Sequence, residues 1–331
     1  MLRFGILGFG AHGDRRLMPG FARARQAWVS ALSRRSIEKA RATAAQYGIP
    51  HAFDSKEALC RCPEVDAVLV STPNAEHCED VLLALRCGKP VLCEKPMAMN
   101  TAEAEAMARA AAEAGLLLGV AQIFRFEEST RRLRERLAAD EIGAPVFARA
   151  EFSYNGLSHP RRWLLNRALS GGGPVADVGV HCLDALRFIL NDEVRTITAL
   201  ARTDANSGEV EAAAVLALAF ARGTLATVLV SLRADYRTPL EFVGTRGVLR
   251  ADDGLTVDHP IRIERWKSGQ LDETETVDNS LAYARQVDAF AAALAGGPAF
   301  PVPAAEGVRN QRLLDAAYAS IASGESVTLE P

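Results

Sequence analysis

The stretch GILGFGAHGDRRL, residues 5–17, decides the fold of this 331-residue chain. The apolar run LRFGIL (2–7) predicts a strand, and a helix is predicted over 15–24. A G-x-G-x-x-G motif between a strand and a helix is typical of a dinucleotide site. Its first glycine permits a tight turn, its second lets backbone approach a pyrophosphate, and its third allows close helix packing. The predicted coenzyme contacts in this motif are Gly8, Phe9, Gly10, Ala11, His12 and Gly13.

The first 121 residues alternate between short β-branched runs and alanine-rich amphipathic segments. This alternation predicts a parallel sheet covered by helices on both faces, a doubly wound α/β Rossmann domain over 1–121. Further strands are expected in WVSALS (28–33), VDAVLVST (65–72), PVLCEK (90–95) and LLLGVAQ (116–122), and further helices over 36–47, 75–87 and 101–114.

Residues 122–331 have a different pattern, with many strands separated by short turns. They predict an α+β domain with a large, mostly antiparallel open sheet, which would bind substrate. An open apolar sheet face usually finds a second subunit, so a homodimer or homotetramer through that sheet is expected. The expected strands include 145–154, 196–203, 211–220 and 224–232, and the expected helices cover 128–138, 281–294 and 305–320.

Composition excludes several classes of partner. The net charge of −3 is spread over both signs, which does not predict a nucleic-acid or membrane-surface partner. The longest apolar run, residues 212–221, has about half of the ~20 residues that a spanning helix needs. No secretory leader is read at the start, and the six cysteines have neither disulfide nor C-x-x-C spacing, so a cytoplasmic protein without a metal site is expected.

The end of the second predicted strand distinguishes NADP from NAD. An aspartate or glutamate about 20 residues past the glycine motif would bind a ribose 2′-hydroxyl. Here that place holds Ser33 and Arg34, followed by Arg35. A hydroxyl and guanidinium groups suit a 2′-phosphate, so NADP (NADPH) is the predicted cofactor.

Two further segments carry chemistry. Residues 91–100, VLCEKPMAMN, place Glu94 and Lys95 at the end of a buried strand. In SGGGPVADVGVHCLDALRFIL (170–190), Asp177 and His181 are spaced i, i+4, and would share a helix face with Asp184. The glycines at 171–173 would let backbone approach a ligand closely.

These motifs, with STPNAEH (71–77) and the closing segments 282–294 and 305–320, resemble the glucose–fructose oxidoreductase/inositol dehydrogenase family, called Gfo/Idh/MocA. The resemblance covers nearly the whole chain. It implies a substrate site between the two domains with Lys95, Asp177 and His181 as the catalytic set. It also implies coenzyme contacts from Ser71, Thr72, Pro73, Asn74, His77, Glu94, Lys95, Gln122, Arg162, Trp163 and Tyr283.

Hydride transfer suggests the role of each catalytic residue. His181 would handle the proton because an imidazole titrates near working pH. Lys95 would hold positive charge beside the reacting oxygen. Asp177 would fix a substrate hydroxyl or the tautomer of the histidine.

The function expected is therefore NADP(H)-dependent oxidoreduction at a CH–OH group of a small sugar-like molecule. Among family branches, the sequence is most similar in look to NADP-dependent sugar reductases such as 1,5-anhydro-D-fructose reductases. The alternatives are NAD(H)-linked inositol or polyol dehydrogenation, glycoside hydrolysis with a retained NAD, and non-catalytic dinucleotide sensing. The first two would favour NAD, and loss of Lys95 or His181 would have indicated the third.

Overall fold

The computed structural model describes residues 1–156 and 162–330, which divide into two compact units. The first unit contains residues 1–123 and 283–311, and the second contains 124–282 and 312–331. The sequence pattern predicted one domain over all of 122–331, whereas in the structure 283–311 returns to the first unit. The return is stabilised by apolar packing, because the Phe290 ring lies 5.7 Å from that of Phe4 in β1 and Phe300 fills the space beside Gly119.

The first unit is built on a six-stranded sheet in which all neighbouring strands are parallel. The strand order is β3-β2-β1-β4-β5-β6, which is that of a dinucleotide-binding Rossmann sheet and confirms the predicted class. The order reverses between β1 and β4, and ligands of such sheets bind outside the carboxyl ends of the strands at that point. The strands are β1 (Leu2–Leu7), β2 (Ala27–Ser33), β3 (His51–Phe53), β4 (Ala67–Val70), β5 (Val91–Glu94) and β6 (Leu118–Ala121).

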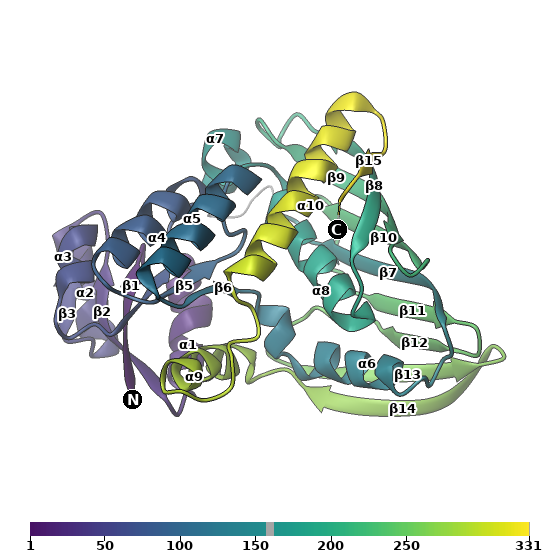
Figure 1. The fold of residues 1–331 in the computed structure, drawn as a ribbon, viewed down its shortest axis with the longest axis horizontal. Coiled ribbons are helices and arrows are strands. Elements are labelled where there is room, and N and C mark those ends of the chain that lie inside the picture. The colour runs from purple at the N-terminus through teal and green to yellow at the C-terminus, as the bar shows by residue number, and fades with distance from the viewer. Residues whose placement is uncertain (157–161, 331) are drawn as a thin grey trace. The chain divides into compact units, whose positions relative to one another are not determined.

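Local capping explains where several helices of this unit begin and end. The Asn100 side chain accepts a hydrogen bond from the backbone of Glu103, and Gly115 ends the same helix in a left-handed conformation. In Figure 1, α4 and α5 run side by side over the sheet. The helices are η1 (Gly13–Leu17), α1 (Met18–Phe21), α2 (Ile37–Tyr47), α3 (Lys56–Arg61), η2 (Asn74–Glu76), α4 (His77–Arg86), α5 (Thr101–Ala114) and α9 (Ala282–Leu294).

The second unit contains a nine-stranded sheet with the order β14-β13-β12-β11-β7-β10-β9-β8-β15. Its neighbouring strands are antiparallel except for β7 and β10, which confirms a mostly antiparallel sheet. Burial alternates along β9: Leu216 and Leu218 are buried, whereas Val215 and Ala217 are exposed on the opposite face. The strands are β7 (Pro145–Ser153), β8 (Val194–Thr203), β9 (Glu211–Phe220), β10 (Leu225–Ser231), β11 (Leu240–Gly244), β12 (Val248–Ala251), β13 (Pro260–Lys267), β14 (Gln270–Asp278) and β15 (Val327–Thr328).

Helices cover one face of this large sheet. Figure 1 shows α8 lying over β7, and α6 beside β13 and β14. Nearly every residue of α8 is buried, including the polar His181, Asp184 and Arg187, because the helix lies between the sheet and its neighbours. The helices are η3 (Ile123–Phe126), α6 (Glu128–Ala138), η4 (Arg162–Leu165), α7 (Arg167–Ser170), η5 (Val175–Gly179), α8 (Val180–Leu190) and α10 (Ala304–Ser323), the last shared between the units.

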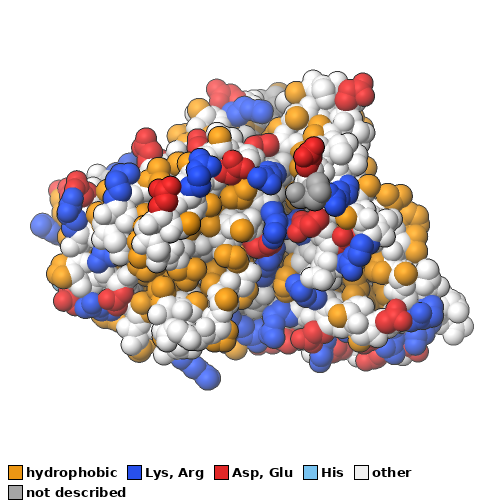
Figure 2. All heavy atoms as spheres, in the orientation of Figure 1, with side chains coloured by type: hydrophobic (Ala, Val, Ile, Leu, Met, Phe, Trp, Pro, Cys, Tyr) orange, Lys and Arg blue, Asp and Glu red, His pale blue; other side chains and the backbone are white. Residues whose placement is uncertain are grey.

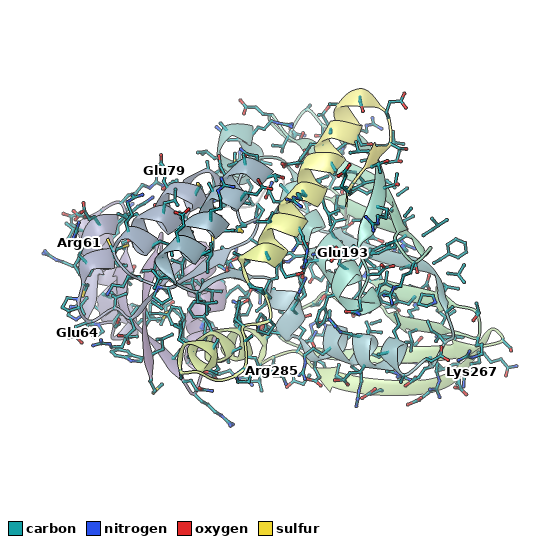
Figure 3. All side chains as sticks on the ribbon, viewed as in Figure 1. Arg61, Glu64, Glu79, Glu193, Lys267 and Arg285 are labelled. Carbon is teal, nitrogen blue, oxygen red and sulfur yellow. The ribbon has the colours of Figure 1, made fainter. Side chains whose placement is uncertain are left out.

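Charged side chains of both signs are interspersed over the surface drawn in Figure 2. At the periphery of the first unit, Figure 3 labels Glu64, whose carboxylate accepts a hydrogen bond from Arg3 at 2.6 Å. Arg3 also binds Asp66, which ties the start of β1 to the turn before β4. Within the described ranges, no helix combines the length and the apolar character needed to cross a membrane.

Candidate active site

The glycine loop follows β1 at the point where the strand order reverses. Gly8 has φ +77°, and a Cβ there would collide with Thr72, which follows β4. At Gly10, by contrast, the nearest atom that an added Cβ would meet is the Gly8 carbonyl oxygen at 3.8 Å. Gly8 is therefore needed for packing within the protein, while Gly10 leaves open space that a ligand can approach.

The turn after the loop opens as a wide helix. Helical structure begins at Ala11, and η1 is a π-helix that α1 continues. The helix expected over 15–24 therefore begins earlier, at Ala11, and ends earlier, at Phe21. The Phe9 backbone N–H donates to the Ser33 carbonyl at 3.0 Å, so Phe9 joins β1 to β2 rather than offering its amide to a phosphate. The helix start leaves backbone N–H groups available for an anion.

The end of β2 holds the two residues that predicted the ribose preference. Ser33 is buried, and its Oγ accepts a 3.4 Å hydrogen bond from the Gly8 backbone. The half-buried Arg34 donates from Nη1 to Thr43 Oγ1 at 2.6 Å, which holds its guanidinium against α2. The positions where an acidic ribose ligand was expected therefore carry a hydroxyl and an anchored cation.

The loop after β4 is fixed by buried polar contacts. Thr72 Oγ1 donates to Asp80 Oδ2 at 2.7 Å. His77 is buried, with Nε2 3.0 Å from the Thr72 carbonyl and Nδ1 2.9 Å from the Pro96 carbonyl. Burial lowers the pKa of His77, although both carbonyls oppose that shift. Thus His77, predicted as a coenzyme contact, joins the β4 loop to the segment that carries Lys95.

Several predicted residues lie close together at the carboxyl end of β5. His12 Nε2 lies 2.9 Å from Glu94 Oε1, and the Tyr283 ring of α9 is 6.0 Å from the His12 ring. Burial raises the pKa of Glu94, but the attraction of His12 and neighbouring cations outweighs it, so this pKa is lowered. Lys95 follows directly, and its bond to Pro96 is cis.

Three residues expected from the β4 loop, Ser71, Pro73 and Asn74, lie beside those contacts. The Ser71 backbone N–H donates to the Leu7 carbonyl at 2.9 Å, and the buried Asn74 starts η2. At the end of β6, Gln122 is buried, and its Oε1 has no hydrogen-bond partner among residues 1–156 and 162–330. A buried, unpaired amide oxygen in a coenzyme-binding unit fits a polar ligand.

The second unit brings together Asp177, His181 and three aromatic residues. Asp177 lies in the π-helix η5, and His181 lies one turn further on in α8. The Tyr154 hydroxyl donates to Asp177 Oδ2 at 2.6 Å. The ring of His181 is 4.7 Å from that of Phe124 and 6.2 Å from that of Phe152. This set presents one carboxylate and one imidazole within an aromatic wall.

Sequence reasoning missed Tyr154, Phe124 and Phe152. Tyr154 follows the last residue of β7, where alternation alone predicts only which face a side chain takes. The signal that could have found it is its position directly after the strand, because polar groups there often line a site.

Asp184, expected to share a helix face with Asp177 and His181, binds Arg125 instead. Its carboxylate accepts hydrogen bonds from Arg125 Nε at 2.9 Å and Nη2 at 2.7 Å. Both side chains are buried, at 1% and 9% residue exposure, so this pair anchors η3 to α8. Removing one partner of such a pair leaves an uncompensated buried charge, which gives Asp184 a structural role.

The glycines at 171–173 were expected to let a ligand approach closely. At Gly172 and Gly173 this expectation was wrong, because other parts of the protein occupy the space beside them. A Cβ on Gly172 would collide with the Tyr318 hydroxyl, and one on Gly173 with the Glu211 carbonyl. Glu211 is buried and accepts hydrogen bonds from the Gly173 and Val175 amides and from Tyr318. The space beside these glycines is therefore filled by the protein's own Tyr318 hydroxyl and Glu211 backbone carbonyl, and the Glu211 carboxylate stabilises the start of η5.

The remaining predicted residues lie in a short helix of the second unit. Arg162 and Trp163 open η4, directly after the undescribed stretch 157–161; Arg162 is exposed and Trp163 half-buried. Their contact with coenzyme stays a prediction. Among the residues that the structure describes, no group of three or more His, Cys, Asp or Glu side chains could hold a metal ion.

The sheet order and the glycine loop define a dinucleotide-binding protein of the Rossmann class. Residues 2–122 match the oxidoreductase family with an NAD-binding Rossmann fold, and residues 130–250 match the GFO/IDH/MocA C-terminal domain. The chain belongs to the Gfo/Idh/MocA family of oxidoreductases, which confirms the resemblance read from its motifs.

Relatives match along the whole length of the chain. It is 31% identical to a 1,5-anhydro-D-fructose reductase from Ensifer adhaerens, covering 100% of this chain and 99% of the relative. It is 32% identical to a D-xylose 1-dehydrogenase (NADP(+)) from Haloferax volcanii, covering 99% and 100%.

Solved structures share the fold. An aldose-aldose oxidoreductase from Caulobacter crescentus, in complex with glycerol, has a TM-score of 0.91 at 27% identity and covers 99% of both chains. A 3-ketoreductase from Actinomadura kijaniata, in complex with NADP and TDP-benzene, has a TM-score of 0.87 at 25% identity, with 96% and 97% covered.

Proposed function

We propose that this protein is an NADP(H)-dependent oxidoreductase that acts on a carbonyl or hydroxyl group of a sugar or sugar derivative. The observation that carries the proposal is the glycine loop, in which Gly10 leaves open space beside a helix start. Full-length relatives named as sugar reductases and dehydrogenases support the substrate class.

The residues of the first unit fit a nicotinamide dinucleotide. Gly10, Ala11 and His12 would hold the pyrophosphate, because this backbone opens a helix and Gly10 has no Cβ to obstruct it. Ser33 and Arg34 would bind the 2′-phosphate, and Gln122 would offer its unpaired Oε1. When bound, the coenzyme would supply or accept a hydride.

The preference for NADP rests on the end of β2. Arg34 is held against α2 by Thr43, so its charge is already positioned at a place where NAD enzymes carry a carboxylate. A prepositioned guanidinium suits a phosphate because it forms several charge-assisted hydrogen bonds at little further entropic cost.

Three side chains would handle charge and proton at the reacting group. Lys95 stabilises negative charge as it develops on the substrate oxygen. His181, in its aromatic surroundings, gives or takes the proton at that oxygen. Asp177 fixes a substrate hydroxyl or the tautomer of His181.

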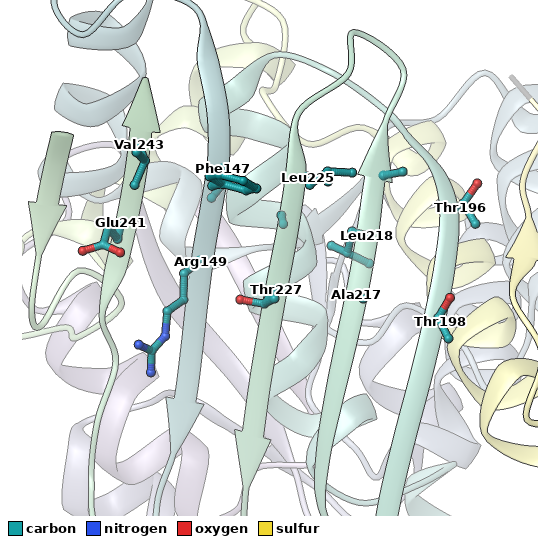
Figure 4. Close-up of a pocket in the computed structure, with 13 residues that line it drawn as sticks. Phe147, Arg149, Thr196, Thr198, Ala217, Leu218, Leu225, Thr227, Glu241 and Val243 are labelled. Carbon is teal, nitrogen blue, oxygen red and sulfur yellow. The ribbon is translucent and has the colours of Figure 1, made fainter. Parts of the chain in front are cut away.

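We also propose that the open face of the nine-stranded sheet binds a second copy of the chain. Figure 4 shows this face, where β7 to β11 form a shallow groove of about 540 Å³. Phe147 and Leu225 line it and are 54% and 50% exposed. Arg149 and Glu241 lie at paired positions on the neighbouring strands β7 and β11. In a dimer with a two-fold axis, Arg149 of one copy can therefore face Glu241 of the other.

The test of the enzymatic proposal is a panel of keto-sugars, aldoses and polyols with NADPH, NADP⁺, NADH and NAD⁺. We expect a change in reduced-nicotinamide absorbance with at least one sugar, and tighter binding of NADPH than of NADH. The Gly10→Val variant should fold normally, because open space surrounds this position. It should nevertheless lose coenzyme binding, because its side chain would occupy the space proposed for the pyrophosphate. If the wild-type protein binds neither coenzyme, or binds but oxidises and reduces nothing, the proposed function is wrong.

A further inference from the structure

Tyr154 is held rigidly at the end of β7. Its backbone N–H donates to the Ser231 carbonyl at 2.9 Å, and the Gly156 N–H donates to the Leu232 carbonyl at 2.9 Å, which pins both residues to the end of β10. A Cβ on Gly156 would lie 2.7 Å from the Tyr154 ring, so the absence of a side chain there lets the backbone pack on that ring. On another side, the Phe152 ring is 6.4 Å away.

The hydroxyl of this fixed ring meets Asp177. The 2.6 Å separation between Tyr154 Oη and Asp177 Oδ2 lies in the range of charge-assisted O–H···O⁻ bonds, which are about twice as strong as neutral ones. Asp177 is buried and belongs to a π-helix, a rare geometry that occurs mostly at functional sites. The wide turn and the hydroxyl together fix where the carboxylate points.

We propose that Tyr154 is a positioning residue that orients the Asp177 carboxylate for catalysis. The inference rests on the proposed function, in which Asp177 fixes a substrate hydroxyl or the His181 tautomer. A carboxylate that can rotate loses either role, because both require one oxygen at a set place. Tyr154 itself transfers no proton in this scheme.

A second tyrosine provides a matched comparison. Tyr236 packs its ring 6.2 Å from Phe152, much as Tyr154 does, but its hydroxyl lies 2.9 Å from Thr256 Oγ1. Tyr154→Phe and Tyr236→Phe therefore remove the same atom from two rings that pack on the same phenylalanine. A difference in activity between the two variants therefore measures the effect of the Tyr154–Asp177 hydrogen bond rather than of ring packing.

The experiment compares both variants with the wild-type protein, using the best substrate of the sugar panel. We expect Tyr154→Phe to lower kcat/KM about 10-fold or more, as for a lost hydrogen bond to a charged group, and to displace its pH profile. NADPH affinity should be unchanged, and Tyr236→Phe should behave like the wild type. Equal kcat/KM and equal pH profiles for Tyr154→Phe and the wild type would overturn the inference.

A crystal structure of the Tyr154→Phe variant gives a readout that does not depend on activity. We expect the Asp177 carboxylate to take another orientation; a carboxylate that stays in place shows that Tyr154 does not position it. If the wild type turns over no sugar, the proposed function fails, and this structure still decides whether Tyr154 holds Asp177.

Discussion

His12 Nε2 lies 2.9 Å from Glu94 Oε1, and this contact joins the glycine loop to the strand that leads into Lys95. The carboxylate is buried, and its pKa is below the ordinary value of 4.5 because His12 and neighbouring cations outweigh the effect of burial. Through this one contact, the loop that would bind phosphate and the lysine that would meet substrate are held together.

This pair predicts how stability depends on pH. A lowered pKa contributes stability that is complete above the unfolded value of about 4.5 and is lost as pH falls through the folded value. Glu94→Gln should therefore destabilise the protein by about 1 kcal/mol at pH 7, with a gap in Tm that closes in acid. Glu79→Gln, on the exposed side of α4, is the control and should change little. A difference in Tm between wild type and Glu94→Gln that widens as pH falls would contradict the lowered pKa of Glu94.

The catalytic assignment predicts separate effects on turnover and binding. His181→Ala should lower kcat about 100-fold or more, the scale of general acid–base catalysis. Lys95→Ala should depress kcat more than it weakens NADPH binding, because its charge acts on the reacting oxygen. His259→Ala, half-buried in the second unit before β13, serves as control in steady-state kinetics. Unchanged rates in both site variants would remove Lys95 and His181 from the mechanism.

Coenzyme preference should respond to one charge at the end of β2. Arg34→Asp should weaken NADPH binding by about 1–3 kcal/mol, the range for charge-assisted hydrogen bonds, and leave NADH binding equal or stronger. Arg41→Asp makes the same charge change at an exposed position of α2 and should have a small effect. Fluorescence titration measures both affinities. Equal losses in the two variants would indicate a general field effect, and tighter binding of NADH by the wild type would refute the predicted NADP preference.

The packing of Gly172 against Tyr318 predicts a destabilised variant. Gly172→Ala places a methyl group on the Tyr318 hydroxyl and should cost about 1–3 kcal/mol in the free energy of unfolding. Tyr318→Phe removes that oxygen, so the double variant should lose less than the sum of the single changes. Gly179→Ala is the control, because its nearest contact would be an ordinary 3.4 Å. Denaturant unfolding measures each value, and strict additivity would argue against the contact.

The open sheet face predicts a change in assembly. Leu225→Glu places a charge in the groove lined by Phe147 and should shift the protein toward monomer in sedimentation or light-scattering measurements. Leu271→Glu, at a 44% exposed position on the edge strand β14, is the matched control and should leave assembly unchanged. A monomeric wild-type protein, or an unchanged mass for Leu225→Glu, would exclude this interface.

Where the sequence pattern was long and regular, it predicted the bounds of helices correctly. The helices α5 and α6 begin and end where their sequence pattern indicated, over 101–114 and 128–138. The helix after the glycine loop was less well predicted, because a π-turn depends on packing that no local propensity encodes. The three-residue strand β3 and the short helix α3 were missed, since segments of that length carry almost no periodicity.

Sequence alone determined the class of the first unit, the family and the candidate residues of the site, because glycine spacing, strand–helix alternation and short motifs are local properties of the chain. Only the tertiary structure decided what those residues touch. It paired Asp184 with Arg125, filled the space beside Gly172 with Tyr318, brought Tyr154 to Asp177, and returned 283–311 to the first unit. Each of these depends on contacts between residues distant in sequence, which are set by packing and by the need of buried polar groups for partners.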